Sequence, residues 1–125
     1  DESEKCNYQY VVVEVNEEAT TLNRDEILML LQAENILARR YFFPGCHRME
    51  PYRSYFPNAY LMLANTNILA GRVLVLPTGT AVGAREIVAV CRILKLALHN
   101  PLAVRKLLRD RGLGANETSG RLTTA

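Results

Sequence analysis

Residues 36–52 read Ile-Leu-Ala-Arg-Arg-Tyr-Phe-Phe-Pro-Gly-Cys-His-Arg-Met-Glu-Pro-Tyr, and this stretch decides the fold that we expect. Its first half, Ile36 to Phe43, is aliphatic and aromatic and predicts a strand. Pro44 and Gly45 end that strand, because proline cannot donate a hydrogen bond to a sheet. The second half gathers rings and ionisable groups in a loop, and loops carry functional residues more often than the scaffold beneath them. The sequence therefore predicts a strand that leads into a functional loop.

The flanking sequence predicts two more strands and several helices. Residues 8–15 and 72–77 are short apolar runs, typical of strands covered on both faces or awaiting a partner. Asn23 and Glu26 have the spacing of a capping box, and the apolar pattern after them predicts a helix. The expected helices are 24–34, 59–70 (ended by Gly71), 84–98 and 102–109. This order predicts an α+β fold, a two-layer sandwich in which a small, mainly antiparallel sheet of about three strands packs against helices.

The chain has the length and composition of one ordinary globular domain. We expect this domain to span residues 7–112, with a flexible segment at 1–6 and a disordered tail at 113–125. Three strands make a narrow sheet for a chain that is 49% hydrophobic. Exposed apolar patches mark interfaces, so we expect a homo-oligomer or docking on a larger protein subunit.

Cysteine usage and charge narrow the possible classes of function. Cys6, Cys46 and Cys91 have no paired short spacing, so we expect no metal site and a reducing, cytoplasmic location. Cys91 falls on the apolar side of its predicted helix, where we expect it to be buried. No apolar run approaches the length of a membrane span, so we expect no membrane partner. A net charge of +2 makes nucleic acid an unfavoured partner, because such partners require a clustered basic patch.

His47 has two interpretations. It could contact a ligand or donate a proton, because histidine is the side chain that commonly exchanges protons near neutral pH. It could also be a half-exposed loop histidine that is hydrogen-bonded to a nearby carbonyl. We favour the second interpretation, because no nucleophile or second base accompanies it and catalysis needs a constellation of groups.

The arginines beside the rings of residues 39–55 could form a surface for phosphates and rings. However, Arg39 and Arg40 alternate along a strand and point to opposite faces, so they cannot form one clamp. We expect them to face solvent or to pair with acids. The glycine-containing turn at 78–83 lacks the lysine and the spacing of a phosphate-binding loop, so we expect it only to cap the next helix.

Four segments in a fixed order carry a resemblance to a known family. They are Asn7-Tyr-Gln-Tyr, Arg24-Asp-Glu, residues 34–52 and Arg72-Val-Leu-Val-Leu-Pro77. Together they resemble the C-terminal small domain of the DegT/DnrJ/EryC1/StrS aminotransferases, which use pyridoxal phosphate (PLP) to transaminate keto sugars attached to nucleotides. The chain departs from the family at 65–67 and 70–71, where a more strongly helical, charged pattern is usual.

In that family the segment that matches residues 41–52 lies toward the nucleotide-sugar side of the active site. The resemblance therefore implies that Tyr41, His47, Arg48 and Tyr52 face a ligand or an interface. The family's cofactor lysine, the acid that pairs with the pyridine nitrogen and the phosphate cradle belong to a large domain that this chain does not match. We therefore expect no catalytic residue, no cofactor and no enzymatic activity in this chain by itself.

The function implied is that of a non-catalytic, stand-alone homologue or fragment of the small domain. It would act through association, with itself or with a larger subunit, and keep a residual affinity for nucleotide-sugars. One alternative is a part of a PLP-dependent nucleotide-sugar aminotransferase that complements a separate catalytic domain. A second alternative is a module that binds anionic ligands or nucleic acid.

Overall fold

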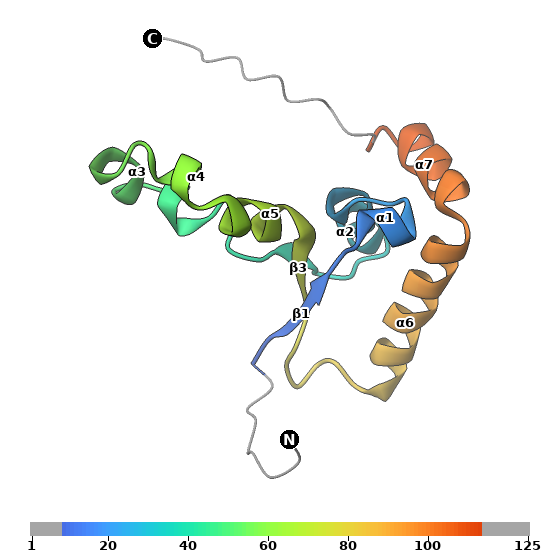
Figure 1. The fold of residues 1–125 in the computed structure, drawn as a ribbon. Helices are drawn as coiled ribbons and strands as arrows, with labels where there is room; N and C mark the ends of the chain where they lie inside the picture. The colour runs from blue at the N-terminus through green and yellow to red at the C-terminus, as the bar shows by residue number, and fades with distance from the viewer. Residues whose placement is uncertain (1–8, 114–125) are drawn as a thin grey trace.

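The computed structural model describes residues 9–113 (Figure 1). The expectations for residues 1–6 and for the tail beyond Leu113 lie outside these residues. The elements, in order, are β1 (Val11–Glu14), α1 (Glu17–Thr20), α2 (Arg24–Ala33), β2 (Arg39–Arg40), the 3-10 helix η1 (Cys46–Arg48), α3 (Tyr52–Tyr55), α4 (Ala59–Met62), α5 (Ala64–Arg72), β3 (Val73–Leu76), α6 (Ala84–His99) and α7 (Pro101–Asp110).

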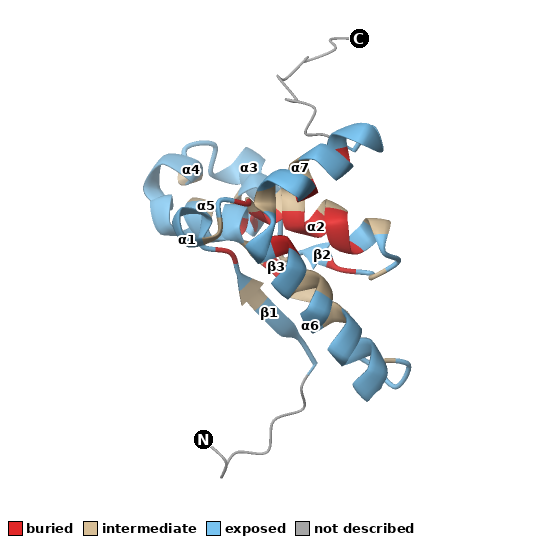
Figure 2. Cartoon of the chain, turned by 90° about the vertical axis from the view of Figure 1, so that its right-hand side faces the viewer, coloured by how far each residue is buried: buried red, intermediate tan, exposed pale blue. Residues whose placement is uncertain are grey.

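The three strands form one antiparallel sheet in the order β1-β3-β2. Val13 of β1 and Arg40 of β2 both lie opposite Leu74 of the central strand. Leu74 is only 1% exposed and belongs to a core cluster that also contains residues of α2, α6 and α7. Buried residues gather on α2 and β3 in Figure 2. The predicted α+β fold with a small antiparallel sheet packed against helices is confirmed.

Helix α2 forms where its capping box predicts it. Asn23 Oδ1 accepts a hydrogen bond from Glu26 N at 2.8 Å, and Glu26 Oε2 accepts one from Asn23 N at 2.9 Å. These bonds satisfy backbone donors that the first helical turn leaves free. Ile27, Leu30 and Leu31 then fall on the buried face of the helix.

Arg24 is a buried arginine that joins α2 to the junction of α5 and β3. Its side chain is 2% exposed, and Nη1 donates to Ala70 O at 3.3 Å and to Val73 O at 3.2 Å. Its Nε lies 2.7 Å from Asp25 Oδ1, and its guanidinium carbon lies 4.9 Å from the centre of the Phe43 ring. Burial lowers the pKa of Arg24, and the neighbouring Asp25 carboxylate works against that shift.

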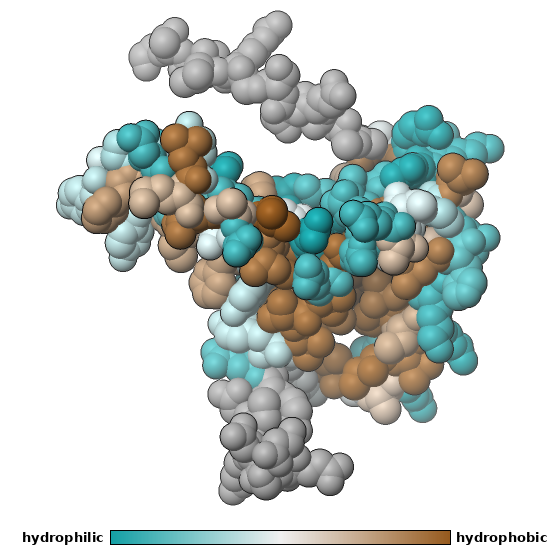
Figure 3. Space-filling model, in the orientation of Figure 1, coloured by the Kyte–Doolittle hydropathy of each residue, from teal (hydrophilic) through white to brown (hydrophobic). Residues whose placement is uncertain are grey.

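Helices α3, α4 and α5 form an arm that extends from the sheet, away from α6 and α7 (Figure 1). Large hydrophobic side chains along this arm remain exposed, as they do in β1 and on the outer side of α6. Figure 3 shows hydrophobic residues at the surface of the arm and in the region between β1 and α6.

Several local expectations were wrong in detail. The strand expected at 36–43 pairs only at Arg39 and Arg40, because the chain then turns and Phe42 adopts a φ of 46°. Helix α1, whose N-cap is Asn16, is not among the helices that the sequence predicted. Gly71 does not end its helix, which continues to Arg72.

Cys91 is exposed, not buried as expected. Helix α6 packs inward through Val90, Ile93, Leu94 and Ala97, and Cys91 is not part of this stripe. The 78–83 turn ends as predicted in a cap for α6, since Glu86 Oε2 accepts a hydrogen bond from Gly83 N at 2.9 Å.

Within residues 9–113, no single helix has both the length and the apolarity needed to cross a membrane; α6 and α7 meet that test only as a pair bent by 104°.

Candidate functional site

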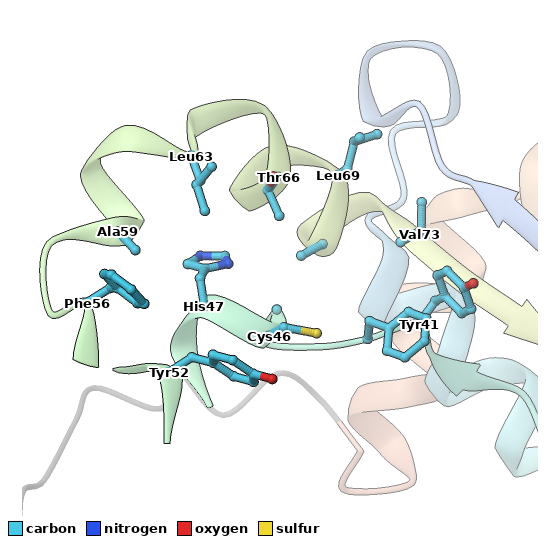
Figure 4. A pocket seen from close by; sticks show the side chains of 13 residues that line it. Tyr41, Cys46, His47, Tyr52, Phe56, Ala59, Leu63, Thr66, Leu69 and Val73 are labelled. Carbon is cyan, nitrogen blue, oxygen red and sulfur yellow. The ribbon is translucent and has the colours of Figure 1, made fainter. Parts of the chain in front are cut away.

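A cavity of about 550 Å³ lies between the loop that follows β2 and the α3–α5 arm (Figure 4). Its wall is mostly apolar and aromatic. The lining residues are Tyr41, Phe42, Gly45, Cys46, His47, Tyr52, Phe56, Ala59, Leu63, Thr66, Leu69, Ala70 and Val73. A largely apolar cavity with a few polar groups is the usual form of a small-molecule site.

Three of the four predicted site residues meet in this cavity. Tyr41, His47 and Tyr52 line it, although they come from the residue after β2, from η1 and from α3. Arg48 does not line it. Its Nε donates to Asn67 Oδ1 at 3.2 Å, and its guanidinium carbon lies 5.9 Å from the centre of the Tyr60 ring. The cavity thus brings together the rings and the histidine, with Arg48 bound to a neighbouring helix.

Tyr41 is held at one end of the cavity by other rings. Its ring centre lies 4.5 Å from that of Phe42 and 5.9 Å from that of Tyr10, with an interplanar angle of 62° in both pairs. Edge-to-face pairs of this kind add stability beyond the area that they bury. The pairs therefore fix the position of the Tyr41 ring between the sheet and the loop.

His47 is half-buried, and its Nε2 lies 2.8 Å from Asn67 Oδ1 on α5. The ring packs against Gly45, where an added Cβ would lie 2.7 Å from His47 Cε1. Gly45 also has a φ of +102°, which side chains disfavour, so glycine is required there for two reasons. His47 thus lies in η1, half-buried, beside the side-chain amide oxygen of Asn67.

The arginines on the sheet do not form a clamp. Arg40 Nε donates to Asp25 Oδ1 at 2.9 Å, and its guanidinium carbon lies 4.8 Å from the centre of the Phe43 ring. Arg39 is exposed and makes no ion pair with any residue in the described range 9–113. One arginine is therefore paired with an acid and the other faces solvent, as expected.

Glu50 is an acidic residue that lies in the sequence between the lining residues His47 and Tyr52. Its carboxylate accepts hydrogen bonds from Ser54 Oγ at 2.5 Å and from Arg53 Nε at 2.8 Å. The hydrogen bond from Ser54, and after it the one from Arg53, hold the pKa of Glu50 below its ordinary value. Glu50 thus stays ionised and bound within its own turn.

The cavity residues do not fit pyridoxal phosphate. A Schiff base with this cofactor needs a lysine in an enclosed site, and a carboxylate usually pairs with its pyridine nitrogen. Among residues 9–113, no lysine, aspartate or glutamate lines the cavity, and the two lysines of this range, Lys95 and Lys106, lie on α6 and α7. Within the described residues, no three metal-ligating side chains gather in one place either.

Sequence reasoning missed several residues of this site. Gly45, Cys46, Phe56 and Leu63 line the cavity, and Asn67 binds both His47 and Arg48. The Pro44-Gly45 pair carried a turn signal, but nothing in the sequence connects Asn67 with a residue twenty positions earlier.

The fold is that of a small α+β domain with a mostly apolar cavity between the loop after β2 and the α3–α5 arm. The sequence pattern of the DegT/DnrJ/EryC1/StrS aminotransferase family matches residues 1–95, and the chain belongs to this family. A dTDP-4-amino-4,6-dideoxy-D-glucose transaminase of Escherichia coli is 31% identical to the chain over 88 residues. That match covers 70% of this chain and 24% of the relative.

A solved structure, DesI crystallised in the presence of its TDP-sugar product, is also similar. It has 42% sequence identity and a TM-score of 0.68, and the match covers 84% of this chain and 26% of the other. The chain thus spans about a quarter of the length of the relatives that it matches.

Proposed function

We propose that this chain acts by association and supplies one wall of a nucleotide-sugar pocket, without performing transamination by itself. The observation that carries the proposal is the apolar surface of the α3–α5 arm beside the cavity. Tyr55, Leu61 and Met62 on this arm are 70%, 66% and 84% exposed. Monomeric soluble proteins rarely expose large contiguous apolar patches, and such patches mark interaction surfaces.

The partner that we favour is a second copy of the chain, and a larger protein subunit is the alternative. The arm carries Tyr52, Tyr55, Phe56 and Tyr60, and aromatic residues are enriched in protein interfaces. A net charge of +2 gives two copies little electrostatic repulsion to overcome.

The ligand class follows from the cavity and from the relatives. The E. coli relative is named for a dTDP-sugar, and DesI was crystallised with a TDP-sugar product. The faces of Tyr41, Tyr52 and Phe56 suit a base or a sugar ring. Arg48 uses only its Nε in a hydrogen bond within the described residues, so its terminal nitrogens can still bind a phosphate oxygen.

Isothermal titration of the chain with dTDP-D-glucose tests the ligand part of this proposal. We expect measurable binding that His47→Ala and Tyr52→Ala each weaken. The matched control is His99→Ala, since His99 lies at the end of α6 and bonds Lys95 O. Absence of binding, or equal loss in the His99 variant, would contradict a pocket at this cavity.

A second candidate function is favoured by the length of the match. Because the chain spans about a quarter of its relatives, it could complement a catalytic domain carried on a separate chain. For both candidate functions, association and complementation, PLP added to this chain alone should give no lysine-dependent absorbance band. Such a band would overturn the proposal that the chain is not an enzyme by itself.

A further inference from the structure

One side chain, Asn67 of α5, joins three parts of the cavity region. Its Nδ2 donates to Tyr60 O at 2.6 Å. Its Oδ1 accepts from Arg48 Nε at 3.2 Å and lies 2.8 Å from His47 Nε2. The amide therefore fastens η1 to both α4 and α5.

Two of these partners fix the orientation of the amide. Tyr60 O can only accept a hydrogen bond, so it must face the Asn67 NH₂ group. The Arg48 Nε–H group can only donate, so it must face the Asn67 oxygen. A flipped amide would place oxygen against oxygen and N–H against N–H.

The same orientation fixes the proton on His47. The atom that faces Nε2 is an amide oxygen, which has no hydrogen to give, so Nε2 must carry the hydrogen. In the neutral ring Nδ1 then has a lone pair and no hydrogen. No group within residues 9–113 donates to Nδ1.

We propose that Asn67 is a positioning residue that holds His47 in the Nε2–H form and so decides which hydrogen bond the cavity offers to a ligand. Any ligand that hydrogen-bonds to the neutral ring must donate to Nδ1, through a hydroxyl or an N–H group of its sugar or base. A phosphate oxygen cannot do so, which leaves phosphate recognition to Arg48. The ligand part of this inference rests on the proposed function, whereas the state of the His47 ring does not.

Gly45 packs beside the Nδ1 edge of the ring and carries no side chain that would block it. A Cβ at this position would lie 2.9 Å from Nδ1 and 2.7 Å from Cε1. Any other residue would therefore cover the nitrogen that the inference assigns to the ligand. The two neighbours thus have different roles: Asn67 binds Nε2, and Gly45 places no side chain against Nδ1.

Nitrogen-15 NMR of the free chain tests the state of the ring. The chain has only two histidines, so His99→Gln leaves His47 as the single imidazole signal. At about pH 8, where an ordinary histidine is neutral, we expect a slowly exchanging Nε2–H resonance and a deprotonated Nδ1. Asn67→Asp keeps an oxygen acceptor and should retain this resonance, whereas Asn67→Leu should lose it. Asn65→Leu, the same change at an exposed position of α5, should have no effect.

An Nδ1–H form in the native chain, or an Nε2–H resonance that persists in Asn67→Leu, would overturn the inference. A titration with dTDP-D-glucose then tests its consequence for binding. Asn67→Leu should weaken binding about tenfold, the effect of one lost hydrogen bond, and Asn65→Leu should leave it unchanged. Unchanged affinity in Asn67→Leu would overturn the role of Asn67 in ligand recognition. If the NMR result holds while the native chain does not bind the probe, the proposed function fails and the assignment of the His47 ring stands.

Discussion

Arg105 of α7 and Glu26 of α2 form a bidentate ion pair. This pair joins α7, the last described helix, to α2. Arg105 Nε lies 2.6 Å from Glu26 Oε1, and Arg105 Nη2 lies 3.2 Å from Glu26 Oε2. The same carboxylate accepts the capping hydrogen bond from Asn23 N. The Glu26 side chain therefore caps the first turn of α2 and also anchors α7, although the two helices are far apart in the sequence.

This pair makes stability depend on pH in the acid range. Partial burial works to raise the pKa of Glu26, but the hydrogen bonds from Arg105 and from the Asn23 backbone outweigh it and bring the pKa below the ordinary 4.5. A lowered folded-state pKa contributes stability that is present above pH 4.5 and is lost as the pH falls through the folded-state value. Melting temperatures of Glu26→Gln measured from pH 7 to pH 3 should therefore fall less steeply than those of the native chain.

Glu34→Gln is the control for this experiment, because Glu34 is exposed and lies 3.7 Å from Arg111. It should follow the native pH profile. Equal slopes for Glu26→Gln and the native chain would show that the Arg105 pair does not couple stability to pH.

Arg24→Met should be strongly destabilising. The change leaves Ala70 O and Val73 O without their buried donor and removes one of the two cations beside the Phe43 ring. We expect a loss of about 2–4 kcal/mol in the free energy of unfolding, measured by urea denaturation. Arg39→Met, a change at an exposed arginine, should stay within about 0.5 kcal/mol of the native value. Similar values for the two variants would contradict a structural role for Arg24.

The capping box at Asn23 and Glu26 could be predicted because both halves of that signal lie within one turn of sequence. The residue at which β2 ends could not be predicted from the sequence. Whether Tyr41 and Phe42 stay in the sheet depends on ring contacts with Tyr10 and on the turn at Phe42, and these are properties of the folded chain. Side-chain pattern alone favours a longer strand there.

The candidate site was predicted in part. Tyr41, His47 and Tyr52 lie within one quoted segment, and the structure brings them to one cavity. Asn67 and Arg24 were missed because their roles depend on partners about twenty to fifty residues away, which no local periodicity reports. The burial of Cys91 was predicted wrongly, because α6 has apolar residues on two faces and its sequence does not say which face meets the core.

Gly45→Ala should damage both stability and the cavity. The position has a φ of +102°, and the new methyl group would collide with the His47 ring. We expect a loss of about 1–3 kcal/mol and weaker binding of dTDP-D-glucose. Gly71→Ala is the matched control: it lies within α5 with no atom within 4 Å of the new Cβ, so it should be neutral or stabilising by up to about 1 kcal/mol. A Gly45→Ala variant as stable as Gly71→Ala would contradict the packing of His47 on Gly45.

The association surface can be tested by making the arm polar. Leu61→Ser with Met62→Ser removes two of the most exposed apolar side chains of α4. If the arm forms the interface, the dissociation constant of the self-association should rise at least about tenfold, as expected when buried apolar anchors are lost. Leu102→Ser on α7, where the side chain is 78% exposed, should leave self-association unchanged. Loss of association in Leu102→Ser but not in the α4 variant would place the interface elsewhere.

Sedimentation analysis of the native chain over a wide range of concentration tests the central claim most directly. The chain has a mass of 14.1 kDa. If it acts by self-association, the weight-average mass should rise with concentration toward about twice this value, as mass action requires for a dimer. A mass that stays at 14.1 kDa up to the highest concentration would contradict the proposed self-association.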